Sequence, residues 1–345
     1  MQEGRIQPTT VPERASRPKA VYWVLSLGLA AVFLYFSLRG IQWGSVWSTL
    51  RSANLAIVAG VVVWSSLTLY LRAYRWRVLL SARSQVSIPS AFWATSAGYL
   101  GNNMLPARAG EIIRTMMISR STGLSRTYVL TTALSERIVD AIALVTISAM
   151  VLLFVNVEAG WISRAGRPFA ILGLCGVAGI VLLPVLERFW FRMLHKTGLP
   201  ASLLTKAEHI LHQALDGVRS FHNPGRLASF LGLTTVIWLM DGLTTVACGQ
   251  AIGLSISMPV ALLLVAGLGL SSALPSTPGY VGIYQFVAAA ILPQFGIDRN
   301  HAIAYIFLFQ AIIYVVVLFW GSIGLSLGRK TLATTLTPET ANSQA

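Results

Sequence analysis

Long runs of apolar residues, separated by short segments that carry most of the charges, dominate this chain of 345 residues. A helix needs about 20 predominantly apolar residues to cross the ~30 Å hydrocarbon core of a bilayer. Six runs approach or exceed that length, and they lie at 20–38, 54–71, 127–155, 168–184, 227–252 and 303–327. The pattern predicts an all-α integral membrane protein with about six full transmembrane helices.

Two further apolar stretches, 89–105 and 258–293, are each interrupted by proline and glycine in a similar arrangement. The first contains Asn102-Asn103-Met104-Leu105-Pro106-Ala107-Arg108-Ala109-Gly110, and the second contains Ser271-Ser272-Ala273-Leu274-Pro275-Ser276-Thr277-Pro278-Gly279. Backbone groups freed by such breaks are tolerated at membrane depth only where protein or a water-filled cavity covers them. We therefore expect two re-entrant or broken helices. A helix end at a surface loop is the alternative for either motif taken alone.

The distribution of lysine and arginine favours one orientation, because short cytoplasmic loops carry the positive excess. With the N-terminus inside, the predicted cytoplasmic segments hold 20 of the 26 basic residues, the outer segments hold five, and Arg137 lies within a span. Both termini are then cytoplasmic. The first broken helix enters from the cytoplasm and the second from outside, which predicts an inverted repeat, an arrangement common in transporters.

The remaining segments complete a one-domain organisation in which residues 20–328 form the transmembrane unit. Residues 1–19 and 329–345 are polar and lack apolar periodicity, so we expect two disordered cytoplasmic tails. Residues 201–221 place apolar side chains at helical spacing, which predicts an amphipathic helix on the cytoplasmic surface. The predicted location is a bacterial inner membrane, which the chain crosses several times.

The composition excludes several classes of protein. Apolar residues make up 55% of the chain and charged residues 11%, whereas ordinary soluble domains are about 25% charged. The net charge of +14 comes from basic residues placed between apolar runs, which indicates membrane topology and not a nucleic-acid-binding face. Cys175 and Cys248 lie in apolar segments, and His209 with His212 is more typical of an exposed helix face than of a metal site. No metal or cofactor is therefore expected, and no nucleotide-binding or hydrolytic motif occurs.

Ionisable residues inside the predicted spans are the strongest functional candidates, because a charge at the bilayer centre costs about 2.5–3.5 kcal/mol on insertion scales. The third span contains Glu136, Arg137 and Asp140. Helical spacing puts the two carboxylates on one face and Arg137 within reach of Asp140, so the group is partly self-neutralising. Asp241 lies in the middle of the fifth span without an intrahelical cation and is expected to face the interior.

The first broken helix supplies the expected partners for these carboxylates. Arg108 and Arg114 flank its break, with Glu111 between them. We predict that they complete a charged network around a polar cavity in the cytoplasmic half of the bundle. An architectural ion-pair cluster that binds no substrate is the alternative.

A second group of arginines lies at the cytoplasmic end of the second span. Arg72, Arg75 and Arg77 surround Trp76 there. Tryptophan and arginine at a span end are typical of anchoring at the lipid interface and of binding lipid phosphates. Anchoring is the favoured interpretation.

Several ordered motifs together resemble the lysylphosphatidylglycerol synthetase transmembrane, or flippase-like, family over about residues 20–328. They are Leu71-Arg72-Ala73-Tyr74-Arg75-Trp76-Arg77, then 102–111 with Pro-Ala-Arg-Ala-Gly-Glu, then Glu136-Arg137-Ile138-Val139-Asp140, then 275–282. The resemblance implies a membrane part that moves aminoacylated phosphatidylglycerol, which a separate soluble domain makes from aminoacyl-tRNA. This chain is expected to hold the flippase half only, so no phosphatidylglycerol lysyltransferase activity is expected.

One position departs from the family pattern. The second broken-helix motif usually reads Pro-Gly-Gly-x-Gly followed by a glutamate, whereas here Pro278-Gly279-Tyr280-Val281-Gly282 is followed by Gln285. The neutral side chain puts in doubt any mechanism that needs a carboxylate at this position.

The resulting hypothesis is a lipid flippase in which two opposed broken helices form a path for an anionic or aminoacylated headgroup. Arg108, Arg114 and Arg137 would attract phosphate, and the neighbouring carboxylates would balance charge or relay protons. Membrane lipids are the expected partners, and a separately encoded lipid-modifying enzyme is a further candidate. Two alternatives remain open: a non-transporting partner of an envelope-lipid or glycolipid pathway, and a membrane-embedded lipid transferase.

Overall fold

The computed structural model describes residues 17–105, 109–154, 223–272 and 277–334, together with isolated residues between 168 and 221. All regular elements in these ranges are helices, which confirms the all-α prediction for the described part of the chain. The predicted span at 168–184, most of the amphipathic segment 201–221 and most of both tails lie outside it. The same holds for Pro106, Arg108 and Pro275.

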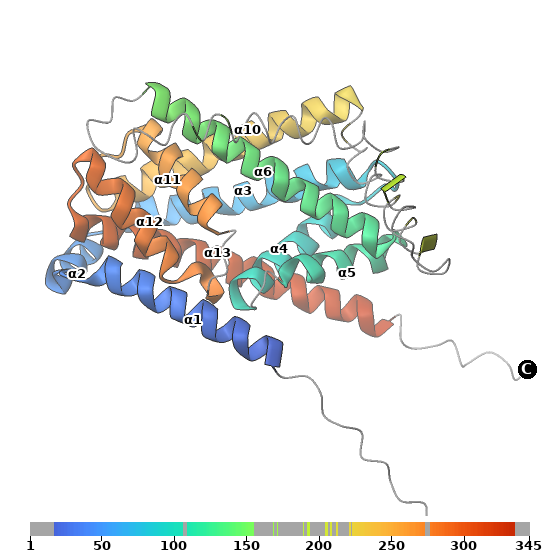
Figure 1. Cartoon of the computed structure of the whole chain (residues 1–345), viewed down its shortest axis with the longest axis horizontal. Coiled ribbons are helices and arrows are strands. Elements are labelled where there is room, and N and C mark those ends of the chain that lie inside the picture. The colour runs from blue at the N-terminus through green and yellow to red at the C-terminus, as the bar shows by residue number, and fades with distance from the viewer. Residues whose placement is uncertain are drawn as a thin grey trace, which may run out of the picture.

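Long helices form the frame of the molecule (Figure 1). They are α1 (Arg17–Leu38), α3 (Leu55–Leu80), α6 (Arg126–Phe154), α10 (Pro224–Ala251) and α13 (Arg299–Thr334). Within the described residues, three segments are long and apolar enough to cross a membrane: α3, α10 and the part of α13 up to Gly328. Helix α6 is 29 residues long and carries the charged residues of the predicted third span.

Helices α3 and α10 lie antiparallel and begin at side chains that cap them. Asn54 precedes α3 and accepts hydrogen bonds from the backbone N–H groups of Ala56 and Ile57, and Asn223 with Pro224 starts α10 in the same way. The start of α3 touches the end of α10, because the Asn54 N–H donates to the Ala251 carbonyl at 2.7 Å. The end of α3 therefore lies beside the start of α10.

The first interrupted stretch folds back on itself. Helix α4 (Ile88–Met104) starts near the end of α3, and α5 (Gly110–Thr122) returns beside it. Glycines make the close approach possible: a β-carbon on Gly101 would lie 2.6 Å from the Ile113 side chain and 2.8 Å from the Gly110 Cα. Helix α5 ends at Gly123, whose φ of 72° is the left-handed conformation that favours glycine at a helix C-terminus.

The second interrupted stretch forms a hairpin that enters from the opposite end of the molecule. Helix α11 (Met258–Ser271) starts near the end of α10, and α12 (Ile283–Ile291) returns toward the same end after the short 3₁₀ helix η3 (Pro278–Tyr280). A second 3₁₀ helix, η4 (Leu292–Phe295), leads into α13. The helices on either side of each interrupted stretch thus form a hairpin, and the two hairpins lie toward opposite ends of the molecule (Figure 1).

Helix α13 packs across both hairpins. On its later half, a β-carbon on Gly321 would lie 2.5 Å from Leu100 Cβ, and one on Gly324 would lie 2.7 Å from the Trp93 carbonyl oxygen, so glycine allows α13 to sit directly on α4. On its earlier half, Ile303 and Tyr305 are fully buried in the largest apolar core, which also includes residues of α10, α11 and α12.

A short helix, α2 (Trp43–Arg51), is absent from the sequence-based prediction. Trp43 and Trp47 are exposed, whereas Val46 is buried against the apolar core. The Gln42 N–H donates to the Asn300 side chain at 2.9 Å, which ties α2 to the start of α13. Exposed tryptophans on an amphipathic helix are typical of a membrane interface, so this element has the anchoring pattern that the sequence suggested for Trp76.

Candidate functional site

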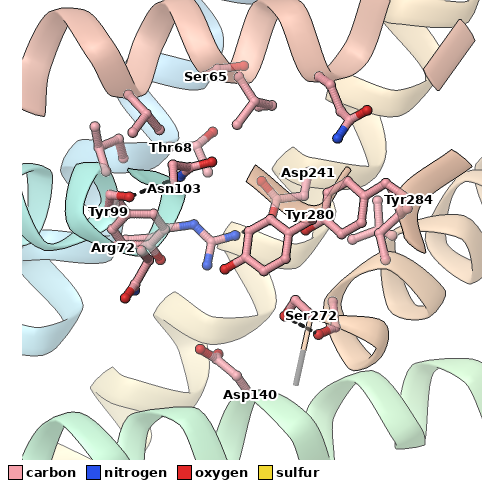
Figure 2. A pocket seen from close by; sticks show the side chains of 18 of the residues that line it. Ser65, Thr68, Arg72, Tyr99, Asn103, Asp140, Asp241, Ser272, Tyr280 and Tyr284 are labelled. Atoms are coloured by element: carbon pink, nitrogen blue, oxygen red, sulfur yellow. Dashed lines mark hydrogen bonds and ion pairs between the residues drawn. The ribbon is translucent and has the colours of Figure 1, made fainter. Parts of the chain in front are cut away.

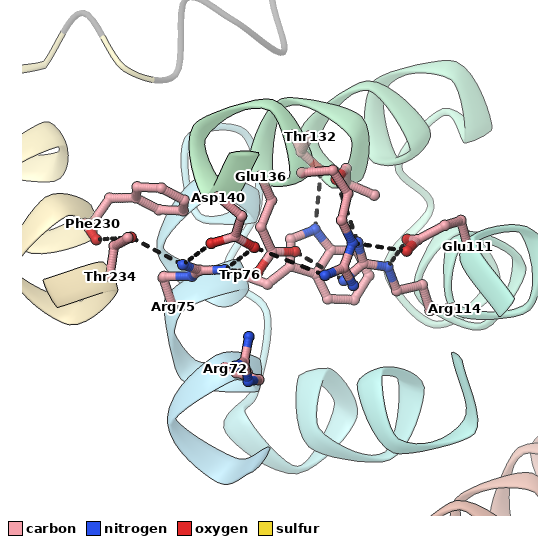
Figure 3. Close-up of polar contacts among 12 residues, drawn as sticks. Arg72, Arg75, Trp76, Glu111, Arg114, Thr132, Glu136, Asp140, Phe230 and Thr234 are labelled. Atoms are coloured by element: carbon pink, nitrogen blue, oxygen red, sulfur yellow. Dashed lines mark hydrogen bonds and ion pairs between the residues drawn. The ribbon is translucent and has the colours of Figure 1, made fainter. Parts of the chain in front are cut away.

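Four arginines and four carboxylates meet between α3, α5, α6 and α10, and we call this group the arginine–carboxylate cluster. Figure 3 shows the part of it around Arg75, Arg114 and Glu136. Every member has an ion-pair partner within the group. The members are Arg72, Arg75, Arg114, Arg137, Glu111, Glu136, Asp140 and Asp241. Their formal charges sum to zero, which is the condition for keeping so many ionised groups away from water.

Arg75 lies at the centre of the cluster. Its side chain is fully buried, and it donates to Asp140 at 2.7 Å and to Glu136 at 2.8 Å. Thr234 of α10 accepts a further hydrogen bond from it at 2.9 Å, and its guanidinium carbon lies 4.9 Å from the centre of the Phe230 ring. These contacts differ from the predicted lipid-facing role of Arg75, because α3 continues past residue 71 to Leu80 and carries this residue into the interior.

Arg114 joins the first hairpin to α6. It donates to Glu111 one turn earlier on α5 and to Glu136 at 2.9 Å. Its guanidinium carbon lies 4.5 Å from the centre of the Trp76 ring, and the Trp76 indole N–H donates to Thr132. Trp76 is therefore buried packing for the cluster and not an interfacial anchor. Arg77, in contrast, donates to the Val86 carbonyl at the loop between α3 and α4.

The remaining arginines lie at the edge of the cluster. Arg137 donates to Glu111 at 3.0 Å and lies 3.8 Å from Asp140, as helical spacing predicted. Arg72 forms an ion pair with Asp241, which supplies the cation that Asp241 lacks on its own helix. The side chains of Arg137 and Asp241 are 23% and 21% exposed, against 3% or less for the inner pair of Arg75 and Glu136.

A cavity of about 270 Å³ lies against this edge (Figure 2). Its wall includes Asn102, Asn103 and Glu111 of the first hairpin, and Ser272, Tyr280 and Tyr284 of the second. Five charged side chains line it: Arg72, Glu111, Arg137, Asp140 and Asp241. The structure thus brings both broken helices and the cavity-facing charges to one place.

A chain of side-chain amides stabilises the break in the second hairpin. Gly279 and Tyr280 have φ values of 72° and 60°, and the latter is unusual for a residue with a side chain. The Gly279 carbonyl accepts hydrogen bonds from Gln310 at 3.1 Å and from Tyr314. Gln310 in turn accepts from Gln285, whose carbonyl oxygen accepts the Gly282 N–H at 2.7 Å. Gln285 is 1% exposed, and its amide both accepts a hydrogen bond from Gly282 and donates one to Gln310. We call this residue a structural clamp, because it links the start of α12 to α13.

Replacing Gln285 with leucine is expected to destabilise the folded protein by about 1–3 kcal/mol, because the Gly282 N–H and the Gln310 carbonyl would each lose a buried partner. Thermal unfolding in detergent, followed by circular dichroism, measures this loss. Gln250→Leu is the matched control, because Gln250 is exposed at the end of α10. Equal unfolding temperatures for the two variants would contradict the clamp.

The structure also identifies lining residues that the sequence did not indicate. They are aromatic or amide side chains: Tyr99, Trp238, Tyr280, Tyr284 and Gln310. Isolated aromatic residues are common in an apolar chain and carry no signal of a cavity. Of these residues, only Tyr280 lies within a motif that the sequence analysis singled out. Gly110 is the first residue of α5 and Pro278 the first residue of η3.

The amino-acid sequence of the chain matches a known family. The family model for the lysylphosphatidylglycerol synthase TM region matches residues 23–321, which include both hairpins, the arginine–carboxylate cluster and the cavity. The chain belongs to the lysylphosphatidylglycerol synthase transmembrane family. It is accordingly a multi-pass membrane protein.

The relatives are distant in sequence: two UPF0104 proteins are matched over nearly their whole length, whereas AglD is matched over less than half of its length. A UPF0104 membrane protein of Pyrococcus horikoshii is 21% identical over 339 residues, which cover 90% of this chain and 98% of the relative. A UPF0104 membrane protein of Methanocaldococcus jannaschii is 23% identical over 222 residues, or 64% of this chain and 91% of the relative. Glycosyltransferase AglD of Haloferax volcanii is 25% identical over 295 residues, which cover 75% of this chain and 46% of AglD.

In this member of the lysylphosphatidylglycerol synthase transmembrane family, the motif residues fall into two structural groups. Gly110 allows the first hairpin to close, and Gly279 allows the second to turn. Arg75, Arg114, Glu136 and the other charged motif residues build the cluster. The described motif residues of this chain therefore lie at the two hairpins and in the charged cluster between them.

Proposed function

We propose that this protein moves a polar lipid headgroup between the two sides of the membrane through the cavity, while the acyl chains stay in the bilayer. The observation that carries the proposal is the cavity of about 270 Å³ to which both broken helices contribute. Binding sites at the meeting point of broken helices that enter from opposite ends are a recurring design of transporters.

The exposed fraction of the charged side chains increases from the centre of the cluster to its edge. This gradient supports a role in substrate transport more than a purely structural role. Ion pairs that serve only to hold helices together gain from complete enclosure, as for Arg75 and Glu136. Arg137 and Asp241 instead remain partly exposed on the cavity wall. Groups at such positions exchange their partners for a ligand at lower cost than the enclosed ones.

The proposal includes the topology that the sequence predicts. The two hairpins would be the halves of an inverted repeat, and rocking of one against the other would open the cavity to each side in turn. Both termini would be cytoplasmic, in a bacterial inner membrane. The chain would act on membrane lipids without covalent chemistry, alongside a separately encoded enzyme that makes the lipid.

Replacing Arg137 with glutamine is expected to lower headgroup transport about tenfold or more, because the variant loses a charged donor on the cavity wall. The substitution should lower the free energy of unfolding by only about 1 kcal/mol. Glu111 would still be paired with Arg114, and Asp140 would still be paired with Arg75. The measurement is the rate at which fluorescent lipids become accessible to an external quencher in proteoliposomes.

Arg39→Gln is the matched control for this assay, because Arg39 is exposed at the end of α1. Transport at the rate of empty liposomes for anionic, zwitterionic and glycosylated lipids alike would remove the flippase proposal.

A non-transporting role in a glycolipid pathway is the second candidate. The similarity to AglD, a protein whose name states a glycosyltransferase, favours it. Here the cluster would be architectural, and the protein would hold or position a pathway enzyme. Normal lipid sidedness in cells that carry Arg137→Gln, together with defective glycolipid synthesis after deletion of the gene, would favour this candidate over transport.

A further inference from the structure

Arg72 and Asp241 differ from the other members of the arginine–carboxylate cluster in how they are held. Among the described residues, these two form an ion pair only with each other, whereas Arg75, Arg114 and Arg137 each contact two carboxylates. Their side chains are 14% and 21% exposed, and both line the cavity, where Figure 2 shows them meeting. A molecule in the cavity can therefore open this pair without disturbing the inner contacts.

The charge of the cavity wall limits what can open the pair. The described residues of the wall include three carboxylates and two arginines: Glu111, Asp140, Asp241, Arg72 and Arg137. A phosphate that took Arg72 from Asp241 would leave a carboxylate without its cation in a largely enclosed site. Such an uncompensated charge is strongly destabilising. A phosphate can therefore bind Arg72 only if the charge of Asp241 is removed at the same time.

A proton on Asp241 removes that charge. The protonated carboxyl group no longer needs a cation, and its O–H can donate to a phosphate oxygen. Uptake of one phosphate monoanion together with one proton leaves the total charge of the wall unchanged. Carboxylates within membrane spans commonly mark proton pathways in pumps and transporters.

Arg72 is better placed for this exchange than the other arginines. Arg114, which the sequence suggested as a phosphate ligand, has a side chain only 2% exposed and is held by two carboxylates. Arg137 lines the cavity but is also held by two carboxylates, so a phosphate would have to displace both. At Arg72, the displacement of one carboxylate is enough.

We infer that Asp241 is a proton-binding site whose protonation releases Arg72 to bind the phosphate of a lipid headgroup. This inference rests on the proposed function for the movement of the lipid, and it specifies that a proton accompanies the headgroup. Asp241 gains one proton from water, Arg72 exchanges Asp241 for a phosphate oxygen, and no covalent bond of the lipid forms or breaks. Release of the headgroup returns Arg72 to Asp241 and frees the proton.

The other ionisable groups around Asp241 are less readily neutralised between about pH 5 and about pH 8. Arg72 and Arg75 face it from α3, and arginine stays charged throughout this range. Asp140 of α6 and Glu111 of α5 are each paired with two arginines. Helix α11 contributes no ionisable side chain. The remaining groups are tyrosines of the cavity wall and of α13, which ordinarily titrate near pH ~10: Tyr99, Tyr280, Tyr284, Tyr305 and Tyr314.

The test measures how lipid binding depends on pH, without requiring transport. Fluorescence anisotropy of a tail-labelled phosphatidylglycerol would give its Kd for the purified full chain in detergent at about pH 8 and about pH 5. We expect the affinity of the native protein to rise about tenfold or more as the pH falls, since uptake of one proton contributes up to about tenfold per pH unit. Asp241→Asn, which imitates the protonated group, should bind with the same affinity at both pH values, and Asp241→Glu should keep the pH dependence.

Asp298→Asn is the matched control, because this exposed carboxylate caps α13 and does not line the cavity. It should keep the native pH dependence. Competition by water-soluble glycerophosphoglycerol would assign the affinity to the headgroup alone, and lack of competition would assign it to the intact lipid.

Binding by the native protein that does not change with pH, or an unchanged pH dependence in Asp241→Asn, would overturn the inference. If Asp241→Asn alone fails to fold, the charge-balanced double variant Arg72→Gln with Asp241→Asn replaces it, and native pH dependence in that variant would equally overturn the inference. Binding whose pH dependence is lost in Asp241→Asn, without movement of the lipid in proteoliposomes, would instead overturn transport alone.

Discussion

Glu136→Gln is expected to destabilise the protein by about 3–5 kcal/mol, which would prevent most of it from folding. The two carboxylate oxygens of Glu136 accept from different arginines, Arg75 at 2.8 Å and Arg114 at 2.9 Å. Glutamine would keep one acceptor and turn N–H groups toward the other guanidinium. The cluster would then hold an excess positive charge in a site where the Glu136 side chain is only 3% exposed.

A second substitution can separate charge balance from the loss of one contact. Adding Arg114→Met to Glu136→Gln removes the excess positive charge, and Glu111 keeps Arg137 as a partner at 3.0 Å. The double variant should therefore be more stable than the sum of the two single variants predicts, by about 0.5–3 kcal/mol. Chemical unfolding in detergent micelles, followed by circular dichroism, measures all three variants.

Asp298→Asn is the matched control for Glu136→Gln. It also converts a carboxylate to an amide, but Asp298 is exposed and accepts from the N–H groups of Asn300 and His301 at the start of α13. Asparagine caps helices about as well as aspartate. An unfolding midpoint for Glu136→Gln equal to that of this control would show that the cluster does not hold the helices together.

The sequence predicted the elements whose signals are local. Apolar runs identified α3, α10 and α13, and the interruptions at 89–105 and 258–293 fall where α4 and α11 end. The i to i+3 spacing of Arg137 and Asp140 gave their contact. Each of these signals lies within one helix or one loop, where periodicity and proline have direct structural consequences.

The features that the sequence did not indicate depend on contacts between distant segments. Arg75 meets Glu136 across 61 positions, and Gln285 meets Gln310 across 25, so neither pair has a sequence signature. The hydrophobicity pattern also placed the end of the second span too early, at residue 71, whereas α3 continues to Leu80. Arg72 and Arg75 lie beyond residue 71 and indicated the end of the span, but carboxylates on other helices neutralise their charges. Helix α2 was missed because its nine residues include polar ones on the face opposite Val46.

Gly110→Ala is expected to prevent closure of the first hairpin, with a loss of stability at or beyond the upper end of the ~1–3 kcal/mol typical of overpacking. Gly110 begins α5 where it crosses α4. A β-carbon at this position would overlap the Gly98 carbonyl oxygen and would lie 2.6 Å from Asn102 Oδ1. Backbone atoms cannot move aside as a flexible side chain can, so α5 would have to shift as a whole.

A shift of α5 would reach the cavity, because Glu111 and Arg114 follow Gly110 on the same helix. We therefore expect Gly110→Ala to lose transport even in the fraction that folds, since Glu111 would leave Arg137 without its acceptor at 3.0 Å. Gly60→Ala on α3 is the control: nothing lies within 4 Å of a β-carbon there, and alanine should add up to about 1 kcal/mol of helix stability. Unfolding temperatures and proteoliposome transport, measured on both variants, test the expectation. If Gly110→Ala and Gly60→Ala had the same unfolding temperature and the same transport rate, the close contact between α4 and α5 at Gly98 would not determine the position of the cavity wall.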